Sequence, residues 1–229
     1  MDASPIRCVA VFEARTEDSL EHNQALWTAN DPFPAAAREF GASRYVRSLS
    51  RRTDERAWRP RTRLGAAQFW LDDLDQALKL GEALKKRRLV ADNRLLADAH
   101  AMVLVTRERP VIPNPNREAV GDNLRALFFI KRKPGMSIAD YQAHWLNVHG
   151  ALVVGTPGII RYIQCHVAPE SYDALAPEYD GMVEMTWSDE AGRAANNASS
   201  HAKAQADDLP NLFDLKAGMR FFVEEETLI

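Results

Sequence analysis

Two histidines, His144 and His149, stand in a segment whose apolar residues recur with the spacing of a helix. At about 100° of rotation per residue, His149 shares a helical face with Ile138 and Trp145, whereas His144 falls roughly 120° away. We therefore expect His149 to be buried against the fold and His144 to be solvated. A buried imidazole with a pKa near neutrality can move a proton at physiological pH. The alternative is a helix-terminal histidine that hydrogen-bonds a backbone carbonyl.

A second group of polar residues lies in segment 159–167, which reads as a strand. Strand alternation places Tyr162, Gln164 and His166 on one face, which therefore lines a cavity or faces water. On the following strand, Glu184 is flanked by apolar residues. A buried carboxylate is costly unless it is paired, so we expect Glu184 to contact a base, either His166 or Lys131.

This group of polar residues has two interpretations. In the functional one, a cluster of histidine, glutamate and tyrosine side chains performs acid–base work on a neutral, mostly apolar molecule. In the structural one, the same side chains form an internal polar network that fixes the register of the sheet.

Other chemistries find less support in the sequence. His144 and His149 are spaced i,i+5, whereas a metal-binding pair on a helix needs i,i+4, so no metal site is predicted. Cys165 does not share a strand face with His166, which argues against a Cys–His dyad there. A glycine-rich phosphate loop and a nucleophile elbow are both missing from the sequence.

Composition indicates an ordinary globular protein. The chain has 229 residues, of which 46% are hydrophobic and 27% charged, enough apolar surface to bury a core. No apolar run approaches the roughly 20 residues that a membrane-spanning helix needs, and the N-terminus lacks the pattern of a signal peptide. With only two cysteines, a disulfide framework is not expected, and we expect a cytoplasmic protein.

The charge pattern argues against a nucleic-acid partner. The formal net charge is −3, and the basic excess is concentrated in residues 44–63 and 85–88. Nucleic-acid binding requires stacking aromatics interleaved with such a patch, but Tyr45 and Trp58 are the only aromatics within residues 44–63. We interpret the arginines as a solvated loop face.

Each half of the chain gives the same order of elements, β-α-β-β-α-β, which is the ferredoxin-like order. In the second half, Ser137 is expected to cap the first helix and Gly150 to end it. The expected elements of that half are strands 124–131, 159–167, 182–187 and 219–225 and helices 137–149 and 189–206. Those of the first half are strands 6–14, 43–49, 66–71 and 101–106 and helices 19–28 and 74–87.

The two halves also share residues. Segment 19–27 matches segment 137–145 at Ser, Gln, Ala and Trp, and segment 41–46 matches segment 158–163 at Gly, Arg and Tyr. We infer an ancient duplication, with halves 1–118 and 119–229. The expected α+β fold is an intramolecular barrel of two four-stranded antiparallel sheets, which cover each other as two single domains of a homodimer would. The chain is thus a monomeric pseudo-dimer, unless it pairs again as a homodimer.

The second half resembles an EthD-type domain of the dimeric α+β barrel superfamily. Four blocks carry the resemblance in the family's order: KRKPGMS at 131–137, WLNVHG at 145–150, RYIQCHV at 161–167 and YDGMVE at 179–184. The usual His-Gly-Pro is His-Gly-Ala here, so the exit of the helix is expected to differ. The first half is similar in scaffold but lacks this signature.

The resemblance implies a small-molecule ligand between sheet and helices, and no metal or organic cofactor is expected. The family includes a protein of ethyl tert-butyl ether degradation and fungal dehydratases, which suggests dehydration, isomerisation or cofactor-free oxidation of a small hydrophobic oxygenated metabolite. His149 would transfer the proton, and His166 and Glu184 would complete the catalytic group. The expected substrate-binding residues are Tyr162, Gln164, Trp145 and Lys131.

Three further expectations follow from the resemblance. A non-catalytic binding or accessory protein is the alternative to an enzyme. A single histidine ligates haem elsewhere in the superfamily, so His149 or His166 could do so here. In the first half, Asp31 and Leu49 fall at the places of His149 and His166, which predicts one active pocket per chain.

Overall fold

The computed structural model describes residues 4–14, 18–51, 62–90, 93–113 and 123–229. The chain divides into two compact units. Unit 1 comprises Met1–Arg107, Ala168–Glu178 and Val223–Ile229, and unit 2 comprises Glu108–Val167 and Tyr179–Phe222. The division predicted between residues 118 and 119 lies outside the described residues and stays a prediction.

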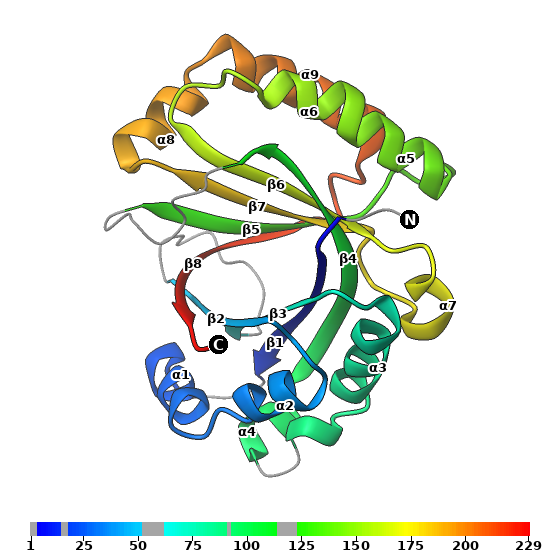
Figure 1. The fold of residues 1–229 in the computed structure, drawn as a ribbon. Coiled ribbons are helices and arrows are strands. Elements are labelled where there is room, and N and C mark those ends of the chain that lie inside the picture. The colour runs from blue at the N-terminus through cyan, green and yellow to red at the C-terminus, as the bar shows by residue number, and fades with distance from the viewer. Residues whose placement is uncertain (1–3, 15–17, 52–61, 91–92, 114–122) are drawn as a thin grey trace. The chain divides into compact units, whose positions relative to one another are not determined.

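Unit 1 contains most of the first half of the chain (Figure 1). Its helices cover one face of its strands, and α3 packs against β1 and against α7. The elements are β1 (Ile6–Ala14), α1 (Leu20–Ala29), α2 (Phe33–Glu39), β2 (Arg44–Ser50), β3 (Thr62–Leu71), α3 (Leu74–Lys85), a 3₁₀ turn (Arg88–Val90), α4 (Arg94–Asp98), the first part of β4 (His100–Ile112) and α7 (Ser171–Leu175).

Unit 2 contains most of the second half (Figure 1). Its elements are β5 (Leu124–Ile130), α5 (Ile138–His144), a π-helical turn (Trp145–His149), α6 (Gly150–Val153), β6 (Ile159–Val167), β7 (Gly181–Trp187), α8 (Glu190–Asn197), α9 (Ser200–Leu212) and the first part of β8 (Met219–Thr227). Strands β4 and β8 each run through both units.

The eight strands form a closed barrel in the order β1-β3-β2-β8-β5-β7-β6-β4. Within each half, the fourth strand lies beside the first, and the third separates the first from the second, as in a ferredoxin-like sheet. The pairs β1–β3, β1–β4, β2–β3, β5–β7 and β6–β7 are all antiparallel. The predicted fold class is therefore confirmed.

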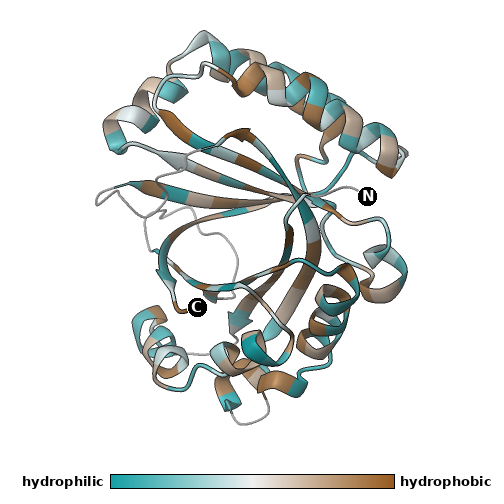
Figure 2. Cartoon of the chain, in the orientation of Figure 1, coloured by the Kyte–Doolittle hydropathy of each residue, from teal (hydrophilic) through white to brown (hydrophobic). Residues whose placement is uncertain are grey.

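Hydrophobic and hydrophilic residues are interspersed along the strands (Figure 2), and successive side chains of a strand point to opposite faces of the sheet. In unit 2, Tyr162 of β6 and Val183 of β7 join the apolar core beneath the helices. That core also contains Tyr141, Trp145 and Phe213. In unit 1, the corresponding core contains Trp27, Phe33, Tyr45 and Phe69, and their rings pack at centroid distances of 5.0–6.1 Å.

The prediction that Gly150 ends its helix was wrong. Ser137 caps the helix as expected, because its hydroxyl accepts the Asp140 N–H at 3.1 Å. Gly150, however, has helical angles (φ −58°, ψ −40°), and the helix continues to Val153. Gly155, with φ +81°, follows the end of α6. A Cβ on Gly150 would approach the Gln164 Nε2 within 3.1 Å, so glycine is needed there for close packing.

The C-terminal helical region also differs from the prediction of one helix over 189–206. Asp189 caps α8 as expected, but α8 ends at Asn197. Ser199 then begins a new helix, because its hydroxyl accepts the Ala202 N–H at 3.0 Å. The new helix, α9, extends to Leu212 and buries Asp208 and Leu212. The short helices α2, α4 and α7 were not predicted.

The packing of the Trp145 ring against Gly181 leads to a first testable prediction. A Cβ at Gly181 on β7 would lie 2.7 Å from Cη2 of the Trp145 ring and overlap Cζ3. Both residues are buried, so Gly181→Ala must displace the indole and should lower the free energy of unfolding by about 1–3 kcal/mol. Urea denaturation measures this change. The control is Gly218→Ala, where the nearest atom, the Phe129 carbonyl oxygen, is 3.7 Å from the added carbon. Equal stabilities of the two variants would contradict the prediction.

Candidate active site in unit 2

The helix over β6 contains one wide turn. The Gly150 N–H donates to the Trp145 carbonyl, a hydrogen bond from i+5 to i that defines a π-helical turn. The same carbonyl accepts a second hydrogen bond from the Gln164 Nε2 at 2.8 Å. A side chain from the sheet therefore bonds to the helix at the point where the helix widens.

The wide turn brings His144 and His149 to one carboxylate. Nε2 of His144 lies 2.9 Å from Oδ1 of Asp208, and Nδ1 of His149 lies 3.0 Å from Oδ2. The His149 side chain is 5% exposed and that of His144 is 26% exposed. The expected burial of His149 is confirmed. The expectation that His144 points elsewhere was wrong, because it assumed the pitch of a regular α-helix.

Asp208 was not identified from the sequence. It lies on α9 one turn before the buried Leu212, so it is an acidic residue on the apolar face of its helix. That placement was the available signal, but it does not identify the partner. The side chain of Asn211 donates a further hydrogen bond to Oδ1 of Asp208 at 3.1 Å.

The charges of this cluster follow from burial and hydrogen bonding. Burial lowers the pKa of His149, and although its hydrogen bond and charge interaction with Asp208 oppose this shift, the net change is downward. Burial alone would raise the pKa of Asp208, but the hydrogen bonds from Asn211, His144 and His149 bring it below its ordinary value. At neutral pH, the cluster therefore contains a carboxylate and a neutral His149.

These states define the His149 tautomer. A carboxylate only accepts hydrogen bonds, so Nδ1 of His149 carries the proton and Nε2 carries the lone pair. Nothing in the described part of the chain hydrogen-bonds to Nε2. This arrangement of a base oriented by a carboxylate is the one that general-base catalysis uses.

His166 is held in the opposite tautomer. The Gln164 amide donates its N–H to the Trp145 carbonyl, so its oxygen faces the His166 Nε2 at 2.9 Å and accepts a proton from it. The His166 ring also stacks on Trp145, with centroids 4.4 Å apart and planes 9° apart. Burial, with a smaller contribution from the positive charge of Arg109, lowers the pKa of His166 to about 3. His166 is thus a neutral hydrogen-bond donor.

Tyr162, Gln164 and His166 share one face of β6, as predicted. That face is covered and does not face water. Tyr162, Gln164 and His166 are all buried, and Trp145 covers them from the helix side. Burial raises the pKa of the Tyr162 hydroxyl, so it stays protonated at neutral pH. Trp145, Tyr162, Gln164 and His166 are therefore brought together, and His149 adjoins them through Phe213, whose ring packs on both His149 and Trp145.

Glu184 and Lys131 are not part of this cluster. Glu184 is fully buried, but its Oε1 lies 2.8 Å from the Arg161 Nε, on the opposite face of β6 and β7. The prediction that Glu184 contacts a base is confirmed, but that base is Arg161, and the suggested partner His166 was wrong. The register explains the error, since Glu184 pairs with Ile163 and shares its side of the sheet. Lys131 is exposed just after β5.

Unit 1 contains an ion pair where the sequence repeat places the counterpart of His149. Asp31 accepts hydrogen bonds from the Tyr45 hydroxyl and from Arg47, both at 2.8 Å. The side chains of Asp31 and Arg47 are 6% and 4% exposed. Both of these partners of Asp31 belong to unit 1, and the expectation of a single active pocket per chain stays a prediction.

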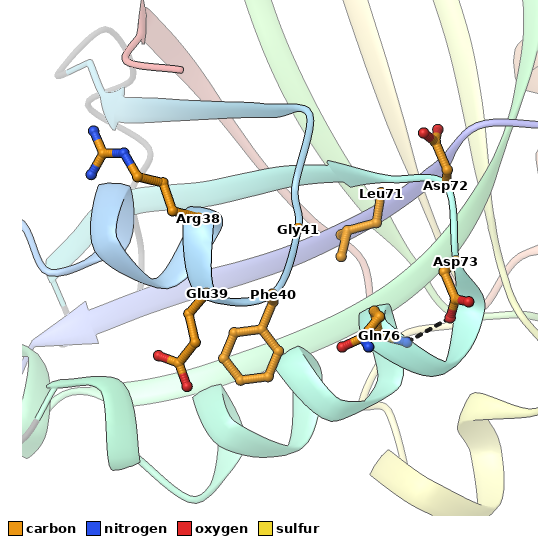
Figure 3. A pocket seen from close by; sticks show the side chains of 8 residues that line it. All are labelled: Arg38, Glu39, Phe40, Gly41, Leu71, Asp72, Asp73 and Gln76. Atoms are coloured by element: carbon orange, nitrogen blue, oxygen red, sulfur yellow. Dashed lines mark hydrogen bonds between the residues drawn. The ribbon is translucent and has the colours of Figure 1, made fainter.

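Two surface hollows are lined by residues that do not belong to this cluster. One, in unit 1, is lined by residues of α2, the end of β3 and the start of α3 (Figure 3). In it, the Asp73 carboxylate accepts the Gln76 N–H at 2.9 Å and caps α3. Another follows residues 197–206 of unit 2. Among the described residues, no group of three or more His, Cys, Asp or Glu side chains is arranged to hold a metal ion.

The residues around the two histidines do not fit a haem. The ring of His166 is covered by Trp145, and its Nε2 is engaged by Gln164. The ring of His149 packs against Phe213 at a centroid distance of 5.7 Å, and Trp145 and Phe213 are themselves buried. A macrocycle would have to displace this aromatic packing.

Comparison with known proteins agrees with the fold. The model of the EthD domain family matches residues 133–216. No curated protein sequence matches the chain. Of the helices in the described ranges, none has the length and hydropathy needed to cross a membrane.

Solved structures extend the similarity to the whole chain. An anthrone oxidase-like protein has a TM-score of 0.60 and 9% identity, over 99% of this chain and 94% of that one. A putative monooxygenase from Fusobacterium nucleatum has a TM-score of 0.55 and 10% identity, over 99% and 95%. A mutant chlorite dismutase from Candidatus Nitrospira defluvii has a TM-score of 0.54 and 8% identity, over 98% and 93%. At these identities, the similarity shows the fold alone.

The neutral state of His166 predicts a pH dependence of stability. In the unfolded chain, this histidine binds a proton near its ordinary pKa of 6.5, but in the folded chain only near pH 3. The folded state therefore loses stability as the pH falls below 6.5, by up to about 1.4 kcal/mol per pH unit from this residue. His166→Gln keeps a hydrogen-bonding side chain but cannot titrate, so its free energy of unfolding should fall less steeply between pH 6.5 and 4.

Urea denaturation at several pH values measures the two slopes. Above pH 7.5, both proteins have a neutral side chain at position 166, so the difference between them should be constant there. Parallel curves from pH 7.5 to pH 4 would show that His166 is not held neutral.

Proposed function

We propose that this chain, whose residues 133–216 match the EthD domain model, is an enzyme that moves a proton on a small hydrophobic oxygenated molecule, without a metal or organic cofactor. The observation that carries the proposal is the pair of Asp208 and His149, in which the carboxylate holds Nδ1 at 3.0 Å and leaves Nε2 for a substrate. Dehydration, isomerisation and cofactor-free oxidation by dioxygen, which accepts the electrons, can all begin with the step that this pair supports.

In that step, Nε2 of His149 accepts a proton from an acidic C–H or O–H group of the substrate. The electron pair of the broken bond stays on the substrate as an enolate or phenolate. His149 becomes an imidazolium whose positive charge lies beside the carboxylate of Asp208, so the ion pair stabilises the product of the proton transfer. Return of the proton to a different atom completes an isomerisation, and return to a hydroxyl leaving group completes a dehydration.

The surroundings favour an apolar substrate. Trp145 and Phe213 border the histidines, and both side chains are buried. His166 is a neutral donor suited to a carbonyl or phenolate oxygen, provided that it exchanges its bond to Gln164. Tyr162, protonated and buried, lies on the same face of β6 and would position the substrate. One of the proteins with a similar fold is described as anthrone oxidase-like, which is a reason to include phenols and quinones among the test compounds.

A binding protein without catalysis is the second candidate. It is favoured by the packing, since Trp145, Tyr162 and Phe213 fill the space between helix and sheet. In that case, the polar side chains would fix the sheet and the helix, and a ligand would need to displace an aromatic ring.

A ligand screen with matched variants tests the proposal. Lactones, phenols, quinones and hydroxy-ketones are added to the wild type, to His149→Ala and to His22→Gln, a control at an exposed histidine in unit 1. We expect a compound that raises the melting temperature of the wild type and of the control but not of His149→Ala.

Turnover of that compound then separates the two candidates. Loss of a general base lowers the rate by about 10²–10⁴-fold, so His149→Ala and Asp208→Asn should both be strongly impaired. Binding without turnover in the wild type would favour the second candidate. Ligand-dependent stabilisation that survives in His149→Ala would contradict the proposed site.

A further inference from the structure

Oδ1 of Asp208 hydrogen-bonds to His144, a residue that takes no part in the proposed proton transfer. Oδ1 lies 2.9 Å from Nε2 of His144, on the side of the carboxylate away from His149. The two histidines therefore share one negative charge. They differ in exposure, since the side chain of His144 is 26% exposed and that of His149 is 5% exposed.

Few polar groups contact this pair among the described residues. On α9, the Asp208 carboxylate hydrogen-bonds both histidines, and the Asn211 amide hydrogen-bonds Asp208. On β6, the neutral His166 stacks on Trp145, and the charge of Arg109 on β4 acts on it. The ion pair of Lys203 and Asp207 on α9 is exposed. Asp208 is thus the only anionic group that hydrogen-bonds to either histidine among the described residues.

One carboxylate cannot stabilise two imidazolium ions as well as it stabilises one. Once one histidine of the pair is protonated, the second proton must be added beside an existing positive charge. The more exposed imidazole loses less hydration when it is charged, so it accepts the first proton more readily. The effect of His144 on His149 is in this direction, since its positive charge lowers the pKa of His149.

We propose that His144 takes up the first proton at this site and, through Asp208, keeps His149 in the neutral form that can act as a base. His144 is then a positioning residue that extends the working range of the base toward acid pH. The consequence for catalysis rests on the proposed function, but the coupling between the two histidines is a property of the protein without substrate.

Titration by NMR tests the coupling. The probe is the ring ¹H and ¹⁵N chemical shifts of His149, followed from pH 8 to pH 4.5 in the uniformly labelled full chain. In His144→Gln, the amide can still donate to Asp208 but carries no charge. We expect the midpoint of the His149 titration to move to higher pH by roughly 0.5–1 unit relative to the wild type.

A double-mutant cycle tests the role of the carboxylate. In Asp208→Asn, the shared charge is gone, so adding His144→Gln should move the His149 midpoint by much less than it does in the presence of Asp208. An equal shift in both backgrounds would overturn mediation by Asp208. An unchanged His149 midpoint in folded His144→Gln would overturn the coupling itself.

Activity separates this inference from the proposed function. Where a substrate is found, the acid limb of kcat/KM should move to higher pH in His144→Gln, with little change at pH 8. Turnover that depends on His149, without a shift of the acid limb, would reject the inference and keep the proposed function. A shift of the NMR midpoint without any His149-dependent turnover would confirm the coupling and reject the function.

Discussion

The arrangement of unit 2 depends on how Trp145 is held. Its indole lies over Gly181, where a side chain would overlap it, and it stacks on His166. Its carbonyl accepts both the Gly150 N–H and the Gln164 amide. Residue 145 is thus fixed at its ring and at its backbone, and the helix must widen to satisfy both. The wide turn in turn brings His144 and His149 to Asp208.

Gln164 connects this constraint to the chemistry. An amide has a donor end and an acceptor end, so donation to the Trp145 carbonyl determines which end meets His166. A carboxylate has only acceptors, so Asp208 determines the tautomer of His149 in the same way. His149 and His166 are therefore set in opposite tautomers by two different partners. His149 carries its lone pair on Nε2, whereas His166 carries a proton on Nε2 and donates it to Gln164.

The sequence predicted the fold more completely than the site. Local signals were sufficient for the strands of each half, because a strand is indicated by the alternation of its own residues. They were also sufficient for the helix starts at Ser137 and Asp189, because a cap depends on a hydrogen bond to a residue three positions further on. The wide turn could not be predicted, because it is caused by Gln164, a residue from another element. The same is true of Asp208, which reaches the histidines from α9. Glu184 was assigned to the wrong partner, because strand alternation gives the face of a residue only relative to its own strand.

The positions of the protons on His149 and His166 can be measured directly. A long-range ¹H–¹⁵N correlation spectrum of the histidine-labelled protein at pH 7.5 distinguishes the two neutral tautomers and the imidazolium. We expect a neutral His149 with its proton on Nδ1 and a neutral His166 with its proton on Nε2. A His149 with its proton on Nε2, or doubly protonated at this pH, would contradict the claim that Asp208 prepares it as a base.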